Sequence, residues 1–331
     1  MKTVVTGAAG FIGANLVRAL LKEGRDVRAV DNVSRGSRRN LEGLNVEVVH
    51  ADLRDWSQTK HAIEGADVVY HLAAMVGSID FLHGSKEAEL NALQSNLAID
   101  ANVFRACVES NVRKVVYASS VSVYPIHKQN ELNAKFKEED IYPIDPEGGY
   151  GWAKLVGEIQ LQMMDNCKSA VARIFNAYGE YGEFGESAQV VQALIRKAIN
   201  YPREDFVVWG DGNQTRNPLY VADAVRALVI VEQYASNPPL VLNIGNERTI
   251  TIKELAGIVV KSSGKEIKIR FDTTKPVGPI SRVPDISKAK HVIGWVPHVD
   301  IEEGVRRTHR WMYDELAGPS IKQDAHSESL F

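Results

Sequence analysis

A glycine-rich turn near the start of the chain constrains the fold more than any other segment. Gly7, Gly10 and Gly13 follow the apolar run 3–5 and surround the start of a helix-like run at Phe11. Glycine lets the backbone turn tightly and approach a ligand closely, and the free amides and positive dipole end of a helix attract phosphate. A strand, a glycine turn and a helix start in this order predict a dinucleotide site, with a purely structural turn as the alternative.

Two acids stand at the ends of the next two predicted strands. Asp31 closes the second strand, and Asp52 follows the third. A carboxylate at the tip of the second strand accepts the ribose hydroxyls of NAD and repels the extra phosphate of NADP. The nearby Arg35, Arg38 and Arg39 leave the choice between the two cofactors open. Asp52 is placed to reach the adenine ring, and a helix N-cap is its alternative role.

The composition fits a soluble enzyme. The 331 residues, 44% of them hydrophobic and 24% charged, suffice for one large core and a smaller lobe. A formal net charge of −3 gives no basic field for nucleic acid, and no apolar run approaches the roughly twenty residues that cross a membrane. The Met-Lys start leads directly into a predicted strand, so we expect no signal peptide. Cys107 and Cys167 are too few for a disulfide framework, so we expect them to stay reduced in the cytoplasm.

Short β-branched runs alternate with helix-period segments through the first half of the chain. The expected strands are 3–5, 27–30, 46–49, 68–71 and 115–118, and the expected helices are 11–23, 56–63, 93–110 and 150–164. This alternation predicts the α/β class, with a doubly wound parallel sheet of Rossmann type. Beyond about residue 175 the pattern becomes irregular, which predicts a smaller C-terminal substrate-binding lobe that contains one more strand at 241–244.

These patterns suggest where the two parts of the chain divide. We expect the NAD-binding Rossmann domain to span 1–175 and to be completed by elements around 217–248. The substrate-binding lobe then comprises 176–216 and 249–315. The polar residues 316–331 are expected to form a disordered tail.

Tyr150 and Lys154 carry the predicted chemistry. A spacing of four puts both side chains on one face of a helix, one turn apart. The pKa of a free tyrosine is near 10, and moving it to about 7 requires roughly 4 kcal/mol of preferential stabilisation of the phenolate. A lysine cation and a positively charged nicotinamide supply this together. The alternative is a helix start with a buried aromatic ring and a lysine whose stem alone is buried.

A strand that ends in Ser119-Ser120 precedes this pair by about thirty residues. Ligands of open parallel sheets bind at the carboxyl ends of the strands, so Ser120 is expected to hydrogen-bond both a reacting hydroxyl and the Tyr150 oxygen. Serines that satisfy turn amides are the alternative. The sequence contains no Gly-x-Ser-x-Gly elbow for a serine nucleophile, and its nine histidines form no metal-binding cluster.

The motifs, taken in order, resemble those of the extended short-chain dehydrogenase/reductase family, and within it the nucleotide-sugar epimerases and dehydratases. The glycine turn, Asp31-Asn32, His71-Leu72-Ala73-Ala74, Ser119-Ser120 and the Tyr150/Lys154 pair carry this resemblance, which extends to about residue 315. The resemblance implies a catalytic triad of Ser120, Tyr150 and Lys154, NAD as the cofactor, and a nucleotide-diphosphate sugar as the substrate.

The same resemblance, with the motifs above, gives the expected site. The cofactor residues are Gly7, Gly10, Phe11, Ile12, Gly13, Asp31, Asn32, Ser34, Arg35, Asp52, Leu53, Leu72, Ala73, Ala74, Tyr150, Lys154 and Phe175. The substrate residues are Ser78, Ser122, Asn176, Gln189, Arg216 and Arg282, where the two arginines match phosphate oxygens. A solvated surface charge is the alternative for each arginine, and an exposed helical position is the alternative for Gln189. No residue is assigned to a metal.

Residues 121 and 122 bear on the type of reaction. Similar 4,6-dehydratases and decarboxylases place a glutamate at the position of Ser122, and the dehydratases often place an aspartate at that of Val121. Neither residue of this chain serves the acid and base steps of dehydration. The GDP-mannose 3,5-epimerases and GDP-fucose synthases carry a cysteine at position 122, and Gln189 stands where a 3,5-epimerase would offer its lysine.

What remains is 4-epimerisation of a UDP-sugar through a transient 4-ketose with no net redox, as in UDP-glucose 4-epimerase. A GDP-sugar 3,5-epimerase or a 4,6-dehydratase is the alternative. Two further alternatives rank below these: an NAD(P)H-dependent keto-sugar reductase and a non-enzymatic dinucleotide sensor.

Two helices show apolar stripes that normally face a core: Leu93, Leu97, Phe104 and Val108, and Leu155, Ile159 and Met163. In the resembled family the corresponding helices pair across a two-fold axis, which implies a homodimer.

Overall fold

Seven strands form one parallel sheet at the centre of the fold, in the order β12-β7-β5-β4-β1-β2-β3. Their bounds are β1 Lys2–Thr6, β2 Asp26–Asp31, β3 Glu47–His50, β4 Val68–His71, β5 Lys114–Ser120, β7 Lys168–Ile174 and β12 Leu240–Ile244. This computed structural model describes residues 1–77, 82, 84–129, 131, 134–185, 188–275 and 282–317. The predicted α/β class and parallel sheet are confirmed.

Burial explains why these strands read as continuous apolar runs. Strands of a parallel sheet are covered on both faces, so alternation between polar and apolar residues is lost. All four residues of β4 are buried, and β1 is buried from its second residue onward. The edge strand β3 is covered less and is mostly exposed. The core therefore lies on both sides of the five inner strands.

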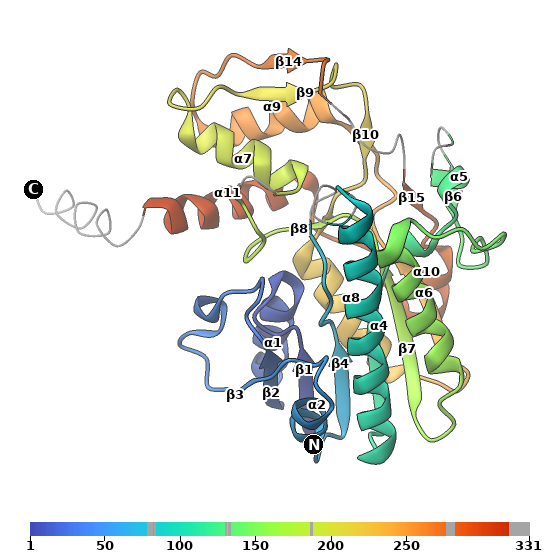
Figure 1. The fold of residues 1–331 in the computed structure, drawn as a ribbon. Coiled ribbons are helices and arrows are strands. Elements are labelled where there is room, and N and C mark those ends of the chain that lie inside the picture. The colour runs from blue at the N-terminus through green and yellow to red at the C-terminus, as the bar shows by residue number, and fades with distance from the viewer. Residues whose placement is uncertain are drawn as a thin grey trace, which may run out of the picture.

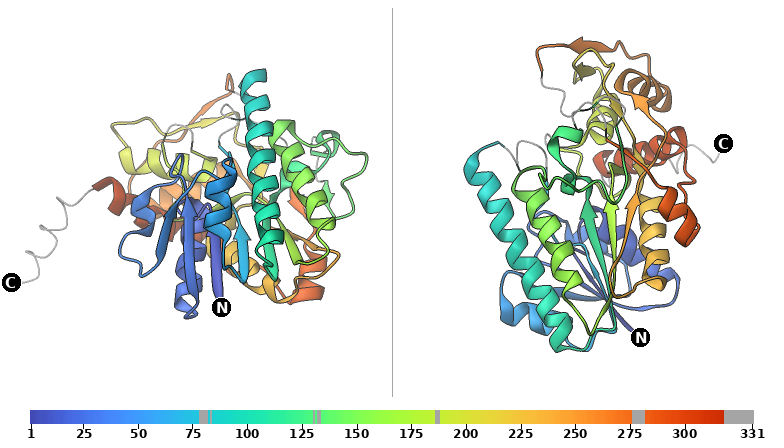
Figure 2. Two further views of the ribbon diagram at one scale, coloured as in Figure 1. Left: turned by 60° about the horizontal axis from the view of Figure 1, so that its bottom comes forward. Right: turned by 90° about the vertical axis from the view of Figure 1, so that its right-hand side faces the viewer.

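Two layers of helices cover the sheet (Figures 1 and 2). One layer contains α1 Phe11–Lys22 and α8 Val221–Gln233, and the other contains α2 Trp56–Ile63, α4 Lys86–Glu109 and α6 Gly148–Gln162. The right-hand view of Figure 2 shows the sheet between the two layers. Because all seven strands are parallel, their carboxyl ends lie at one edge of the sheet.

A second group of elements stands beyond that edge (Figure 1). Its helices are α7 Val190–Asn200, α9 Ile252–Ser263 and α11 Ile301–Ala317, and they pack on one another beside the strand pair β9 Val207–Trp209 and β14 Arg270–Asp272. The smaller elements are η1 Arg38–Leu41, η2 Val121–Val123, α5 Ile126–Gln129, β6 Lys135–Phe136, β8 Ala177–Tyr178, β10 Thr215–Arg216, β11 Leu219–Tyr220, β13 Ile250–Thr251, β15 Val283–Pro284 and α10 Ser287–Ile293. We retain the domain boundaries given above as a proposal. The first two residues of the predicted tail, Leu316 and Ala317, belong to α11, and residues 318–331 lie outside the described residues.

The structure corrects one helix start and one surface assignment. Helix α4 begins at Lys86, seven residues before the predicted start at residue 93, because Ser85 caps it by accepting a hydrogen bond from the Ala88 amide. The predicted apolar stripes do not face the core throughout. Phe104 and Leu155 are buried, whereas the side chains of Val108, Ile159 and Met163 are exposed.

Candidate active site

The glycine turn joins β1 to α1 through very close backbone contacts. Gly7 has a φ of +67°, and a Cβ there would lie 2.8 Å from the Ala73 amide nitrogen. A Cβ at Gly13 would lie 2.0 Å from the Gly7 carbonyl oxygen. Gly10 is the N-cap of α1 and offers no side-chain cap, so the first-turn amides, including those of Phe11 and Ile12, face the space before the helix. This cradle fits a pyrophosphate.

Asp31 stands at the carboxyl end of β2, beside this turn. Its two carboxylate oxygens accept hydrogen bonds from the amides of Ala9, at 2.9 Å, and Val33, at 2.7 Å. These bonds fix the carboxylate next to the cradle, where ribose hydroxyls would meet it. Asn32 accepts from the Ser34 amide at 3.1 Å in the same loop. Arg35 reaches across to Glu183 in the segment that follows β8, with a nitrogen–oxygen distance of 3.0 Å.

Asp52 and Leu53 follow β3. The Asp52 carboxylate binds Arg54 through both oxygens, with a shortest distance of 2.6 Å, and this guanidinium holds the pKa of Asp52 below its usual value. The alternative role of Asp52 as a helix N-cap is wrong, because Asp55 caps α2 by accepting from the Gln58 amide. Leu53 is buried in the core below the sheet edge, so its backbone is the part that remains near the site.

The segment after β4 lies against the glycine turn. The amides of Leu72 and Ala73 both donate to the Thr6 hydroxyl at 3.1 Å, and Ala74 continues this segment. Phe175, directly after β7, is fully buried against the rings of Tyr124 and Phe136. Its side chain therefore packs beneath the site. Contact between Phe175 and a cofactor would come from its backbone.

The structure brings the three predicted catalytic residues together. Ser120 ends β5, and its hydroxyl hydrogen-bonds the Tyr150 phenol. Lys154 lies one turn after Tyr150 on α6, with its Nζ 5.9 Å from the centre of the Tyr150 ring and 4.5 Å from that of Tyr117. Lys154 is 1% exposed, so its whole side chain is buried and not the stem alone.

Burial and nearby charges set the pKa values of Tyr150 and Lys154 in opposite directions. Burial raises the pKa of Tyr150 above its ordinary value, the hydrogen bond from Ser120 lowers it, and the negative charge of Asp100 raises it further. Burial also lowers the pKa of Lys154, while the carboxylates of Asp100 and Glu158 act in the opposite direction. The phenol is therefore protonated at neutral pH in the protein alone. The prediction that a positively charged nicotinamide acts together with Lys154 to stabilise the phenolate therefore stays a prediction.

A buried polar network lies directly behind Lys154, and sequence reasoning missed it. Asp100 on α4 accepts a hydrogen bond from the Tyr117 phenol at 2.6 Å and contacts Nε2 of His71 at 3.0 Å. The other ring nitrogen of His71 contacts the Thr6 hydroxyl at 2.7 Å. Burial lowers the pKa of His71, which keeps the imidazole neutral. The Asp100 carboxylate therefore lies close enough to Tyr150 and Lys154 to act on both through charge.

A second buried cluster anchors α6 to the sheet. Glu158 accepts a hydrogen bond from Ser119 at 2.5 Å and pairs with Arg173 of β7 at 2.7 Å. Glu158 and Arg173 are each 2% exposed. Arg173 also donates to the Tyr124 phenol at 3.1 Å, and that phenol donates to Asn243 of β12 at 2.5 Å. The helix that carries Tyr150 is thus linked to three neighbouring strands.

Glu147 is the principal residue that sequence reasoning missed at the substrate end. Its carboxylate accepts a hydrogen bond from the Ser122 hydroxyl at 3.2 Å and pairs with Arg282 at 2.5 Å. Ser122 lies 3.3 Å, oxygen to oxygen, from Ser120. Glu147 is the N-cap residue of α6, yet its side chain makes no capping bond. No local sequence signal indicates this role, because Arg282 lies 135 positions away along the chain.

Two arginines and one amide complete the substrate end. Burial, then the charge of Arg282, lowers the pKa of Arg216, which places two cations near one another. Within the described residues, the buried Nδ2 of Asn176 and Nε of Arg282 have no hydrogen-bond partner. Unpaired buried donors and two neighbouring cations suit an anionic ligand. Gln189 is exposed at the N-cap of α7, in agreement with its alternative role as an exposed residue, and Ser78 lies outside the described residues.

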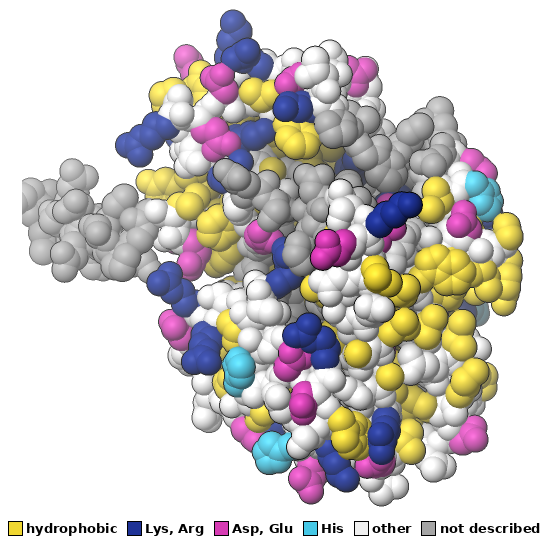
Figure 3. All heavy atoms as spheres, in the orientation of Figure 1, with side chains coloured by type: hydrophobic (Ala, Val, Ile, Leu, Met, Phe, Trp, Pro, Cys, Tyr) yellow, Lys and Arg dark blue, Asp and Glu magenta, His cyan; other side chains and the backbone are white. Residues whose placement is uncertain are grey.

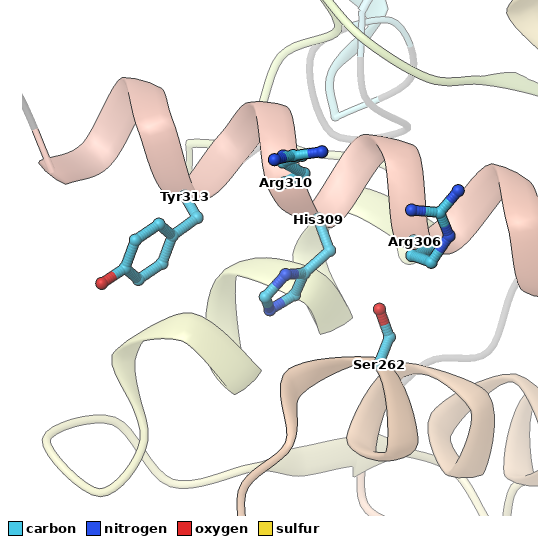
Figure 4. A pocket seen from close by; sticks show the side chains of 5 residues that line it. All are labelled: Ser262, Arg306, His309, Arg310 and Tyr313. Atoms are coloured by element: carbon cyan, nitrogen blue, oxygen red, sulfur yellow. The ribbon is translucent and has the colours of Figure 1, made fainter. Parts of the chain in front are cut away.

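No metal cluster or membrane-spanning helix competes with this interpretation. No group of three or more His, Cys, Asp and Glu that could hold a metal occurs in the described ranges. None of the helices there is long and apolar enough to cross a bilayer. A surface cleft between α9 and α11 is lined by Ser262, Arg306, His309, Arg310 and Tyr313 (Figure 4). It contains none of the predicted site residues.

Comparison with known proteins identifies the class. Residues 3–245 match the family model described as the NAD dependent epimerase/dehydratase family, and the chain belongs to this family. The predicted family and the NAD cofactor are therefore confirmed. The glycine cradle, the Asp31 carboxylate and the buried Lys154 are the residues that would hold this dinucleotide.

Individual relatives are similar along nearly their whole length. GDP-mannose 3,5-epimerase 1 of Oryza sativa subsp. japonica is 28% identical over 320 residues, which covers 96% of this chain and 82% of that protein. A putative UDP-glucose 4-epimerase of Methanocaldococcus jannaschii is 30% identical, covering 93% and 97%. The solved UDP-glucose 4-epimerase of Thermotoga maritima with UDP-glucose has a TM-score of 0.85 at 26% identity, covering 96% and 100%. These names include more than one reaction type.

Proposed function

We propose that the chain catalyses NAD-dependent 4-epimerisation of a UDP-sugar through a transient 4-keto sugar, with no net redox. The observation that carries this proposal is the assembly of Ser120, Tyr150 and Lys154 beside a neutral Ser122. A sugar held there meets a base for its hydroxyl proton. Positions 121 and 122, where similar dehydratases carry their acids, hold Val121 and Ser122.

Each catalytic side chain has a definite task. Tyr150 removes the proton of the sugar 4-hydroxyl, and Ser120 hydrogen-bonds both that oxygen and the phenol. Lys154 stabilises the phenolate by charge, since its ammonium is buried one helical turn away. Bound NAD supplies reversible hydride acceptance from the sugar carbon. When that hydride is returned to the opposite face of the C4 ketone, Tyr150 would return its proton to the C4 oxygen, which gives the inverted alcohol.

Inversion requires that the ketone present its other face to the same residues. The hexose must therefore be held weakly while the nucleotide diphosphate is held firmly. We assign the diphosphate to Arg216 and Arg282, and the two neighbouring cations and the unpaired amide donor of Asn176 support this assignment. The residues next to the reacting carbon, Ser120 and Ser122, are small and neutral. This division of contacts supports 4-epimerisation.

A GDP-sugar 3,5-epimerase is the second candidate, and Glu147 is the observation that favours it. Enolisation beside a C4 ketone needs a base for a carbon-bound proton, and a carboxylate 3.2 Å from Ser122 is chemically able to serve. Glu147 is, however, engaged with Arg282. The 3,5-epimerase similarity therefore defines the control reaction in the test below.

We also propose a cytoplasmic homodimer. Trp152, Ile159 and Met163 of α6 are exposed, and Figure 3 shows hydrophobic side chains gathered over the side of the molecule where α6 lies. Apolar side chains in contact across a two-fold axis would bury this surface. The two cysteines are buried and unbonded, which suits a reducing compartment.

Purified protein incubated with UDP-, GDP-, dTDP- and CDP-sugars in D2O tests the reaction. We expect NMR to show inversion at C4 of a UDP-sugar, with no deuterium at C3 or C5 and no net change in NADH absorbance. Deuterium at those carbons would assign the enolising reaction instead. Stoichiometric consumption of added NAD(P)H would assign a reductase.

A further inference from the structure

Glu147 touches both ends of the substrate site. One carboxylate oxygen accepts from Ser122, which adjoins the catalytic Ser120, and the other pairs with Arg282. In a nucleotide-diphosphate sugar the hexose lies between the reacting 4-hydroxyl and the diphosphate. A side chain that contacts the residues serving both groups therefore faces the hexose itself.

The backbone holds Glu147 at this place. Its amide donates to the Ser122 carbonyl oxygen at 2.9 Å, and its own carbonyl accepts from the Gly151 amide at 3.0 Å. A Cβ on Gly151 would lie 2.3 Å from the Ser122 carbonyl oxygen, so the start of α6 is pressed against this segment. The Glu147 side chain is 23% exposed. A small opening toward solvent is what a residue lining a ligand site should have.

Once a diphosphate binds the two arginines, the Glu147 carboxylate is the charge that remains near the hexose. Arg282 is already paired with Glu147, and Arg216 lies close enough to Arg282 to feel its charge. A diphosphate would engage these cations and leave the carboxylate facing the sugar. Like charges that meet in a site shielded from water oppose binding strongly. The Debye length at physiological salt is about 8 Å, which is longer than a hexose ring, so salt does not fully screen two charges on either side of the ring.

We propose that Glu147 is a specificity-determining residue that restricts the enzyme to nucleotide sugars whose hexose carries no 6-carboxylate. This inference rests on the proposed UDP-sugar 4-epimerase function. The Glu147 carboxylate accepts hydrogen bonds from neutral hexose hydroxyls, and it repels the uronate group of UDP-glucuronic acid. The selection acts through charge, so it does not require Glu147 to take part in proton transfer.

Binding to catalytically silent protein tests the proposal without relying on turnover. In a Tyr150→Phe background, calorimetry with UDP, UDP-glucose and UDP-glucuronic acid gives three dissociation constants. We expect UDP-glucose to bind about tenfold to a hundredfold more tightly than UDP-glucuronic acid. Adding Glu147→Gln should bring the two sugars within about threefold of each other, because the amide keeps the size and removes the charge.

Matched variants separate charge from structure. Glu139→Gln removes an exposed carboxylate of the segment before α6 and should leave the preference unchanged. Ser122→Ala removes the hydrogen bond and keeps the Glu147 charge, so the preference should persist. UDP affinity and the thermal midpoint of each variant report on folding and on Arg282.

Two results would overturn the inference while leaving the proposed function intact. The first is equal binding of both sugars by the Glu147 carboxylate form, alongside normal UDP-glucose epimerisation. The second is an unchanged preference after Glu147→Gln in protein that still binds UDP. Deuterium at C3 or C5 in protein that retains Tyr150, if abolished by Glu147→Gln, would assign Glu147 as a base and reject the proposed 4-epimerisation. Failure to bind any UDP ligand would reject the proposed function itself.

Discussion

The cofactor end and the substrate end of this site are built in different ways. The cofactor end is made mainly of backbone from contiguous segments: a glycine turn, the loop after β2 and the loop after β4 meet at distances that a single Cβ would disrupt. The substrate end is made of side chains from distant segments, since Ser122, Glu147, Arg216 and Arg282 meet through hydrogen bonds and charge. The cofactor end therefore accepts one ligand shape. At the substrate end, substitution of single side chains can change which ligand binds.

This difference explains how one family sustains several reactions. A cradle of main-chain amides would bind NAD, which every reaction of the family uses. Few substitutions are tolerated in this cradle. Side-chain charges and hydroxyls meet the variable sugar, and each can be replaced without moving the sheet. Relatives named as 3,5-epimerase and 4-epimerase both align with this chain over nearly its full length.

The largest expected effect falls where the two ends meet. Tyr150→Phe removes the proposed base and should lower kcat by about a thousandfold, because positioned acid–base groups contribute about 10² to 10⁴. NAD content, measured by absorbance after denaturation, should stay unchanged. Normal sugar interconversion by this variant would reject the assigned base.

A backbone change should damage the cofactor end next. Gly13→Ala places a methyl group 2.0 Å from the Gly7 carbonyl oxygen, so the turn must move and NAD affinity should fall about a hundredfold. Fluorescence titration with NADH measures this loss. Gly257→Ala is the matched control, since a Cβ at that position of α9 meets nothing within 4 Å. Equal NADH binding by both variants would contradict the role of the cradle.

A side-chain change at the substrate end should have a smaller effect. Arg216→Met should raise KM for the UDP-sugar about thirtyfold with little change in kcat, because a charged hydrogen bond to phosphate contributes roughly 2 kcal/mol. Arg203→Met, an exposed arginine of the same lobe, is the control. A fall in kcat at unchanged KM would place Arg216 in the chemical step instead.

The smallest expected effect is a displaced pH profile. The negative charge of Asp100 raises the pKa of both Tyr150 and Lys154. Tyr150 must lose its proton and Lys154 must keep its own, so Asp100→Asn should move both limbs of the kcat/KM profile to lower pH, by about 0.5 to 1 pH unit. Tyr117→Phe retains the carboxylate and should leave the profile in place. Movement to higher pH would show that Asp100 does not act through charge.

Local signals explain which parts were predictable. The strand ends at Thr6, Asp31 and Ser120 follow from short β-branched runs, and the observed bounds differ by only a few residues. The early start of α4 was missed, although Ser85 and the acidic first turn at Glu87 and Glu89 are capping signals. Exposure of Ile159 and Met163 was not predictable, because periodicity shows that a face is apolar and does not show what covers it.

The functional residues also divide into those that a local sequence pattern predicts and those that only the fold brings together. Tyr150 and Lys154 share one helix, so spacing alone places them together. Glu147 meets Arg282 across 135 positions of sequence, and Asp100 meets His71 across 29, so no local pattern indicates either contact. These pairings depend on the order in which strands join the sheet.

The buried pairing of Glu158 with Arg173 has a consequence for how the proposed inversion would proceed. Breaking a buried ion pair typically costs about 3 to 5 kcal/mol, so α6 has little freedom to swing relative to β7 during turnover. A phenol fixed in this way cannot travel to the far side of a bound ketone. The saccharide must then be the component that rotates, about its bonds to the diphosphate, while the surrounding protein stays fixed.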